Sequence, residues 1–449
     1  MWYFVALFAL FIVGVFDGHT SSFAAMLFMF LLGFLSVNSI KSPLGRSNGG
    51  KVLGIVYSVY VISAFIASRS FLDGQYFYVV DSMKYIANYS NVTSWSWDYV
   101  FSRLSNTYFL FSDDNGLYNE TLSLWSYIAN YYFDGASVFY LTMFQTLFGV
   151  LVSLEIYKIF SLYFDSSRAA KYTSIFALLS LFHIYSIVII RDIVIAYFYL
   201  WGLRKVIGKP QITDGFVLLL VVVVTMGIRL YTGLFFGVFI MFWLYKIIQE
   251  TKYANYRIII IPLIILGLSF IGASTASSML TESASGQIDS YDELYSEEGG
   301  TVSTFRNLPI GVRQVVTLFF SQLPLTNFSR FLISNNFSNY YLSTLALMFH
   351  IFNFVVFYGL MYYCFIKRLF KKMEYNDKWM LIIMLVFVAI NLSTHMDYRR
   401  CMEAYPFLFL FYIVYGQKYF PYKWSKVNQS LIFASLFIVL SFSFLTILK

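Results

Sequence analysis

The sequence predicts an all-helical protein that crosses a membrane about thirteen times, since each crossing takes about 20 apolar residues. Of its 449 residues, 59% are hydrophobic and 12% are charged, and the mean hydropathy is +0.68. Soluble domains carry roughly 25% charged residues. The apolar runs are also long and uninterrupted, whereas a membrane β-barrel shows alternating segments of about 10 residues. These observations favour a bundle of spanning helices over a barrel or a soluble domain.

The apolar runs give the expected spans in chain order. They cover residues 2–16, 21–38, 52–68, 137–157, 172–190, 193–203, 215–228, 231–245, 258–273, 340–366, 379–393, 406–417 and 429–447. The first run, "MWYFVALFALFIVGVF", lacks the basic residues that precede the apolar part of a cleaved signal peptide. We therefore expect it to be retained as the first span.

Two connections between these runs are much longer than ordinary loops. Residues 69–136 and 274–339 are expected to form large outer segments that carry short amphipathic helices and function. They separate three N-terminal spans in 1–68, central spans in 137–273, and C-terminal spans in 340–449 that include an arginine-rich outer loop at 394–405. The sequence therefore predicts five regions around one membrane bundle.

The charges predict which side each connection faces. Every second loop is rich in lysine, so the positive-inside rule places these loops and the N-terminus in the cytoplasm. Fifteen of the seventeen lysines fall on that side, but nine of the fourteen arginines fall on the other. Because the arginine fork binds phosphate and carboxylate in a bidentate manner, this asymmetry predicts an anionic ligand at the outer face. Salt bridges to outer carboxylates explain any single arginine equally well.

Two pairs of expected spans are too short to reach across the membrane twice. The 32 residues between Lys171 and Arg204 extend about 48 Å as helix, against about 60 Å for two crossings. Their turn, at Arg191 and Asp192, is therefore expected several Å below the outer surface, and so is the turn at Arg229. Charge at that depth needs surrounding protein or water, which predicts a recessed aqueous pocket. The alternative is that Arg191 pairs with Asp192 or another carboxylate and only holds helices together.

A third polar group occupies the loop "NLSTHMDYRRCMEAYP" at residues 391–406. His395 titrates near neutral pH, and Asp397 and Glu403 are suited to act as bases or to orient its imidazole. Arg399 and Arg400 add two cationic forks. A short, solvated loop of charges is the alternative interpretation.

Several function classes find no support in the sequence. There is no H-E-x-x-H, no Walker loop, and no G-x-G-x-x-G after a strand. Cys364 and Cys401 lie in or beside expected spans, so neither a disulfide framework nor a cysteine metal motif is expected. We predict no metal and no cofactor. The net charge of +8 follows from the topology and requires no nucleic-acid partner.

The layout and four short motifs resemble the polytopic bacterial glycan polymerases of the Wzy and EpsG-like kind. The motifs are "DSMKY" at 81–85, "IIRDIVIAYFYL" at 189–200, "GIRLYTGLFF" at 227–236 and "MDYRRCMEAYPF" at 396–407, together with the two large outer segments. The resemblance covers the chain in its architecture first and in its residues second.

The resemblance implies an enzyme of the bacterial inner membrane that needs no nucleotide sugar. It would transfer a growing polysaccharide from undecaprenyl pyrophosphate to the non-reducing-end hydroxyl of a lipid-linked repeat unit, at the periplasmic face. Membrane lipids and a chain-length regulator protein are the further partners it implies. The site residues expected on this basis are Arg191, Arg229, Arg399 and Arg400 as pyrophosphate ligands, Asp81, His395 and Asp397 as candidate bases, and Tyr231 and Tyr405 as groups that orient phosphate or sugar.

Two other functions fit a cationic outer site. A flippase for the same lipid-linked oligosaccharide also needs to hold pyrophosphate, although transporters of this kind usually have short outer loops and a repeated layout. A ligase that transfers the finished O-antigen chain to the lipid A core is poorly separated from a polymerase by sequence alone.

Overall fold

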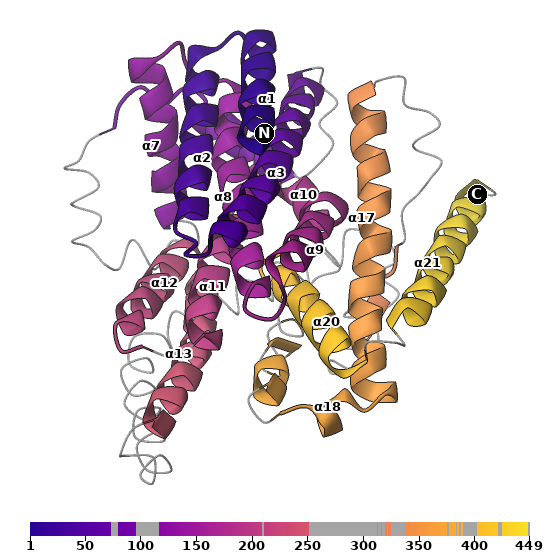
Figure 1. The fold of residues 1–449 in the computed structure, drawn as a ribbon. Coiled ribbons are helices and arrows are strands. Elements are labelled where there is room, and N and C mark those ends of the chain that lie inside the picture. Colours follow the sequence, from indigo (N-terminus) through magenta and orange to yellow (C-terminus); the bar gives the residue numbers. More distant parts are fainter. Residues whose placement is uncertain are drawn as a thin grey trace.

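The computed structural model describes residues 1–72, 80–95, 116–208, 211–250, 337–374, 402–420 and 424–447, and some of the residues within 312–324 and 377–388. Every regular element in these residues is a helix (Figure 1), so the predicted all-helical class is confirmed. The expected span at 258–273 and most of the segment 274–339 lie outside the described residues. The total of about thirteen crossings stays a prediction.

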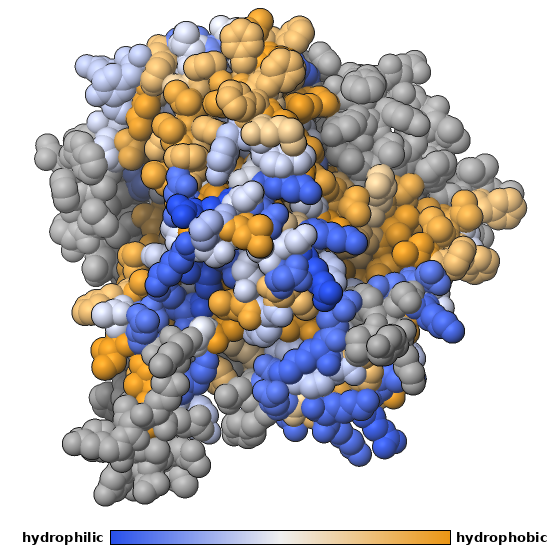
Figure 2. Space-filling model, viewed as in Figure 1, coloured by the Kyte–Doolittle hydropathy of each residue, from blue (hydrophilic) through white to orange (hydrophobic). Residues whose placement is uncertain are grey.

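Four helical segments among the described residues are long and apolar enough to cross a membrane. They are Thr20–Asn38, Pro43–Arg69, Val138–Phe160 and Leu347–Ile366. Helix α1, Trp2–Asp17, is shorter, and its phenylalanines Phe4, Phe8 and Phe11 are exposed. Figure 2 shows hydrophobic residues covering much of the upper part of this face of the protein. An apolar surface of this kind is expected of a chain that faces lipid.

Helix α8, Val138–Phe160, is the centre of the N-terminal bundle. It packs against α2 (Thr20–Asn38), α3 (Pro43–Leu72) and α11 (Asp192–Ile207), and most of its side chains are buried. A helix that is hydrophobic all round is stable where other helices or lipid surround it, and here neighbouring helices bury it. Its N-terminus is capped by the Ser137 hydroxyl, which accepts from the Tyr140 N–H at 3.0 Å.

The connection at 69–136 contains two helices among its described residues. Helix α4 is Val80–Tyr89 and helix α7 is Gly116–Tyr132. Helix α7 lies along α8, where the Trp125 ring stacks on Tyr140 at a centroid distance of 5.0 Å. Helix α7 therefore packs along the side of the N-terminal bundle.

The interval 172–190, expected as one span, is divided in the structure. Helix α9, Ser166–Leu179, ends at Ser180, whose backbone is extended, and α10, Leu181–Ser186, follows. The run Ile187–Val188–Ile189–Ile190 is not helical, in keeping with the lower helix propensity of β-branched residues. The buried carbonyl of Ile189 instead accepts a hydrogen bond from the Ser82 hydroxyl of α4 at 2.9 Å.

Helices α12 and α13 form a tight hairpin next to α11. Helix α12 is Asp214–Ile228, helix α13 is Leu230–Glu250, and Arg229 is the only residue between them. A Cβ on Gly233 would lie 2.5 Å from the backbone nitrogen of Met226, so a glycine is required for the two helices to approach this closely.

The C-terminal part adds a second group of helices. Helix α17, Phe337–Met361, continues into the π-helical turn η3, Tyr362–Ile366, and α18 is Leu369–Lys372. Helices α20, Tyr405–Tyr419, and α21, Trp424–Ile447, both pack against α17 (Figure 1). Helix α20 also contacts α8 and α11, which brings the start of α20 to the start of α11.

Candidate active site at the helix junctions

Four ionisable side chains lie buried where helices begin or end. Arg191 and Asp192 stand at the start of α11, Arg229 stands between α12 and α13, and Glu403 comes two residues before α20. Asp192, Arg229 and Glu403 are fully buried, and Arg191 is 7% exposed. We call these four residues the Arg229 cluster. The cluster joins three parts of the chain that are far apart in the sequence.

The Arg229 guanidinium holds the cluster together. Its Nη1 atom lies 3.0 Å from Asp192 Oδ1, and it also donates a hydrogen bond to Glu403 Oε1. Two carboxylates therefore meet at one guanidinium nitrogen, and the charge of Arg191 acts on Glu403 as well. The two cations lie with two carboxyl groups, which lowers the desolvation penalty of burying their charges.

The start of α11 favours the charge of Asp192. Asp192 lies in the first turn of this helix, where the N-terminal end of the helix dipole stabilises a carboxylate. Arg229 lies between the C-terminal end of α12, which favours a cation, and the N-terminal end of α13, which disfavours one. The charge of Arg229 is therefore stabilised by its carboxyl partners rather than by the helix dipoles.

The backbone around Arg229 is fixed by short-range hydrogen bonds. Its N–H donates to Thr225 O at 2.8 Å, and its carbonyl accepts from the Thr232 hydroxyl at 2.8 Å. The Tyr199 hydroxyl of α11 donates to the carbonyl of Thr232. These contacts tie the α12–α13 hairpin to α11 and set the direction from which Arg229 approaches Asp192.

Burial also changes the acidity of the cluster. It raises the pKa of Glu403 to about 8, while Arg229 and Arg191 lower it and Asp192 raises it further. Near neutral pH, Glu403 therefore takes up a proton more readily than an exposed glutamate does.

Two of the expected site residues adjoin this cluster through their backbone. Asp81 lies in the first turn of α4, next to Ser82, whose hydroxyl donates to the carbonyl of Ile189 just before Arg191. Tyr231 lies in the first turn of α13, two positions after Arg229. The side chains of Asp81 and Tyr231 are outside the described residues, so their expected roles stay predictions.

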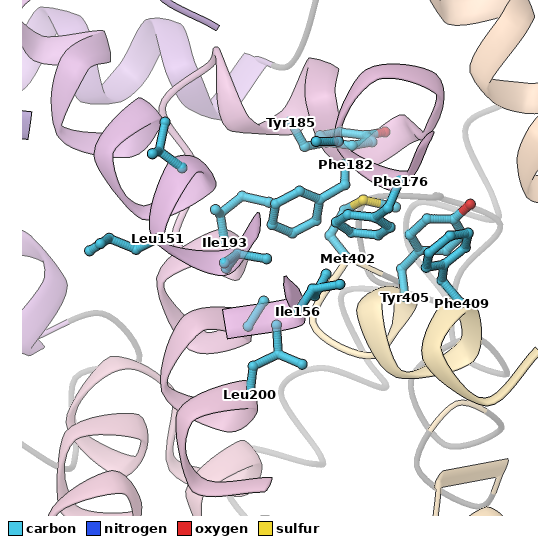
Figure 3. Close-up of a cluster of buried hydrophobic side chains, with 14 of the residues drawn as sticks. Leu151, Ile156, Phe176, Phe182, Tyr185, Ile193, Leu200, Met402, Tyr405 and Phe409 are labelled. Atoms are coloured by element: carbon cyan, nitrogen blue, oxygen red, sulfur yellow. The ribbon is translucent and has the colours of Figure 1, made fainter. Parts of the chain in front are cut away.

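Tyr405 lies in apolar surroundings beside the cluster. Its ring lies beside Phe176 of α9 (Figure 3), which in turn packs against Phe409 of α20, and Tyr405 is fully buried. The centroids of the Tyr405 and Phe176 rings are 6.1 Å apart. This packing anchors the start of α20, whereas the expected contact of Tyr405 with phosphate or sugar stays a prediction.

Four expected site residues lie outside the described part of the chain: His395, Asp397, Arg399 and Arg400. Glu403 follows Arg400 by three positions. The sequence predicts for it only the role of a base or of an orienting partner for His395. Its pairing with Arg229 depends on a contact across 174 positions and has no local signature in the sequence. Within the described residues, no group of three or more His, Cys, Asp or Glu side chains is arranged to hold a metal ion.

The chain matches no family model, no curated protein and no solved structure.

Proposed function

We propose that the protein is a membrane glycan polymerase. It transfers a growing polysaccharide from undecaprenyl pyrophosphate to a hydroxyl of a lipid-linked repeat unit, on the outer side of the bacterial inner membrane. The observation that carries the proposal is the burial of Arg191 and Arg229 with two carboxylates at junctions between apolar helices. Ionisable groups among membrane helices are costly and usually mark a site of function.

In this proposal the arginines bind the leaving group. Arg191 and Arg229, together with Arg399 and Arg400 from the loop before α20, hold the pyrophosphate of the donor. The bond between the sugar and the pyrophosphate oxygen breaks, and negative charge develops on that oxygen. Guanidinium groups in a site with little water stabilise such charge much more strongly than they do in bulk solvent.

Asp192 and Glu403 act as positioning residues for Arg229. Their contacts with Nη1 keep the guanidinium charged and directed toward the junction of α11, α12 and α20 before the donor arrives. An incoming pyrophosphate competes with these carboxylates for the same cation. The proton of the attacking hydroxyl is taken by one of the three candidate bases, Asp81, His395 or Asp397.

Deletion of the gene in its own host tests the proposal. Loss of a polymerase leaves single repeat units on the lipid core, and the full-length gene on a plasmid restores long chains. Chains of normal length in the deletion strain would overturn the proposal. A core without any repeat unit would also overturn it. Long chains that stay on undecaprenyl pyrophosphate would then indicate a ligase, and unpolymerised repeats on the cytoplasmic side a flippase.

A further inference from the structure

A second polar site lies away from the Arg229 cluster, at the end of the N-terminal bundle that is predicted to face outward. The ends of α1, α3, α4 and α7 and the turn before α8 enclose a cavity of about 420 Å³. Its polar lining includes Asp17, His19, Arg69, Asn91, Asn130 and Asp134. This volume falls within the range of roughly 300–1,000 Å³ that is usual for small-molecule sites. We call this cavity the Asp17 pocket.

The walls of the Asp17 pocket are held by side chains with defined partners. Asp134 accepts hydrogen bonds from the backbone N–H groups of Thr20 at 2.8 Å and Ser21 at 3.0 Å, and so caps α2. Burial alone would raise the pKa of Asp134, but these bonds outweigh it and keep the pKa well below its usual range. Asn130 donates to the carbonyl of Val92 at 2.9 Å and closes the side next to α4. The pocket is therefore preformed.

Asp17 is the unusual member of this lining. Its side chain is 5% exposed, and its Oδ1 atom lies 3.9 Å from Arg69 Nη2. Its Oδ2 atom is buried and has no hydrogen-bond donor among the described residues. A buried carboxylate oxygen without a donor is costly, and a ligand that supplies the donor removes that cost.

The chemistry of the lining selects among ligands. Among the described residues, Asp17 pairs with Arg69, and Asp134 lies 3.4 Å from His19 Nδ1, so a phosphate would meet repulsion from two carboxylates as well as attraction. A neutral sugar avoids this repulsion, because its hydroxyl groups both donate and accept hydrogen bonds. The Arg69 side chain is 44% exposed and donates to the carbonyl of Phe16 at 3.2 Å, which holds its guanidinium at the rim.

We propose that the Asp17 pocket binds a sugar residue of the glycan substrate. One sugar hydroxyl donates to Asp17 Oδ2, and a neighbouring oxygen accepts from Arg69. The proposal rests on the proposed function for the identity of the glycan, which the polymerase would hold at a distance from the reacting bond. Binding energy gained on such a remote part of a substrate positions the part that reacts.

Sugar binding to the full-length protein in lipid nanodiscs tests the Asp17 pocket. Saturation-transfer NMR titrations would use glucose, galactose, N-acetylglucosamine and rhamnose as separate probes, with inorganic pyrophosphate as the competing class. We expect at least one sugar to bind. D17N should lower the affinity for that sugar about tenfold, as the loss of a charged acceptor predicts. A136F, which fills the cavity from Ala136 in its lining, should weaken it as well.

Two control variants separate this inference from the proposed function. D165N changes an exposed carboxylate that caps α9 and lies outside the pocket, so sugar binding should be unchanged. R229K should also leave sugar binding unchanged, even where it abolishes polymer. The inference would be overturned if none of the four sugars bound, or if pyrophosphate alone bound. It would also be overturned if D17N and A136F bound the sugar with the affinity of the wild type. If sugar binding depends on Asp17 but the deletion strain still makes normal polymer, the proposed polymerase function is wrong and the sugar site in the Asp17 pocket stands.

Discussion

The Arg229 cluster differs sharply from a second set of ion pairs, formed by Glu155, Lys158 and Arg204. There, Glu155 Oε1 lies 2.8 Å from Lys158 Nζ and Glu155 Oε2 lies 2.7 Å from Arg204 Nε. Each carboxylate oxygen has its own cation, and the cations are 13% and 28% exposed. In the Arg229 cluster, two fully buried carboxylates share one nitrogen. We call the set of Glu155, Lys158 and Arg204 the Glu155 cluster.

The difference indicates what each cluster does. The Glu155 cluster ties α8 to α11, and its buried carboxylate has a separate, partly exposed cation at each oxygen, so its charges are fully paired. Complete burial of the Arg229 cluster carries a desolvation penalty that apolar packing would avoid, so its charges are poor candidates for stabilisation alone. Four substitutions test whether the two clusters differ in this way.

Exchange of arginine for lysine separates the two clusters most clearly. R229K keeps the positive charge but loses the planar guanidinium. We expect the amount of long polysaccharide to fall by about 10²-fold or more, as for loss of one charge-stabilising donor. R204K is the matched control, because a lysine still pairs with Glu155 from a partly exposed position. Polysaccharide length on gels, with membrane abundance of each variant, is the measurement. Equal polymer in the two variants would contradict a special role for Arg229.

The backbone that carries Arg229 is tested at two glycines of α13. G233A places a Cβ against the backbone of Met226 and should cost about 1–3 kcal/mol as the hairpin opens. G237A is the matched control, since a Cβ there meets no atom within 4 Å. It should be neutral or stabilise by about 0.4–1 kcal/mol. Thermal unfolding in detergent measures both, and a similar melting temperature for the two variants would contradict the tight hairpin.

The acidity of Glu403 gives the Arg229 cluster a pH dependence. Because folding raises its pKa from 4.5 to about 8, protonated Glu403 favours the folded state, and that contribution fades as pH rises through this window. Among the described residues, the charged groups that face Glu403 are Arg229, Arg191 and Asp192. As pH rises from about 5 to about 8, we expect the melting temperature of the wild type to fall relative to that of E403Q. Parallel curves for the two proteins would show that the carboxyl stays ionised throughout.

The smallest effect is expected at the Glu155 cluster. E155Q keeps one acceptor oxygen, so either Lys158 or Arg204 loses its carboxylate partner. The loss of stability should be about 1–3 kcal/mol, with polymer length unchanged, so the effect on polymer is the smallest of the four. Melting temperature and gel analysis of the same membranes measure both. A loss of polymer here as large as in R229K would erase the contrast between the clusters.

The sequence by itself determined where the helices lie. The expected runs at 2–16, 215–228 and 406–417 coincide closely with α1, α12 and α20, because a long apolar run forms a helix wherever it is buried or faces lipid. The charge pattern also placed Arg191 and Arg229 at turns, where the structure has them. These are local properties, set by residues within one or two helical turns.

Tertiary structure decided which charges meet. Asp192 pairs with Arg229 from the next hairpin, and Glu403 completes the same contact from the other end of the chain. The Asp17 pocket likewise arises where the ends of α1, α3, α4 and α7 come together. The sequence held no sign of these partners, because a buried ion pair depends on which helix ends touch. That choice is made by the packing of apolar faces that many sequences share.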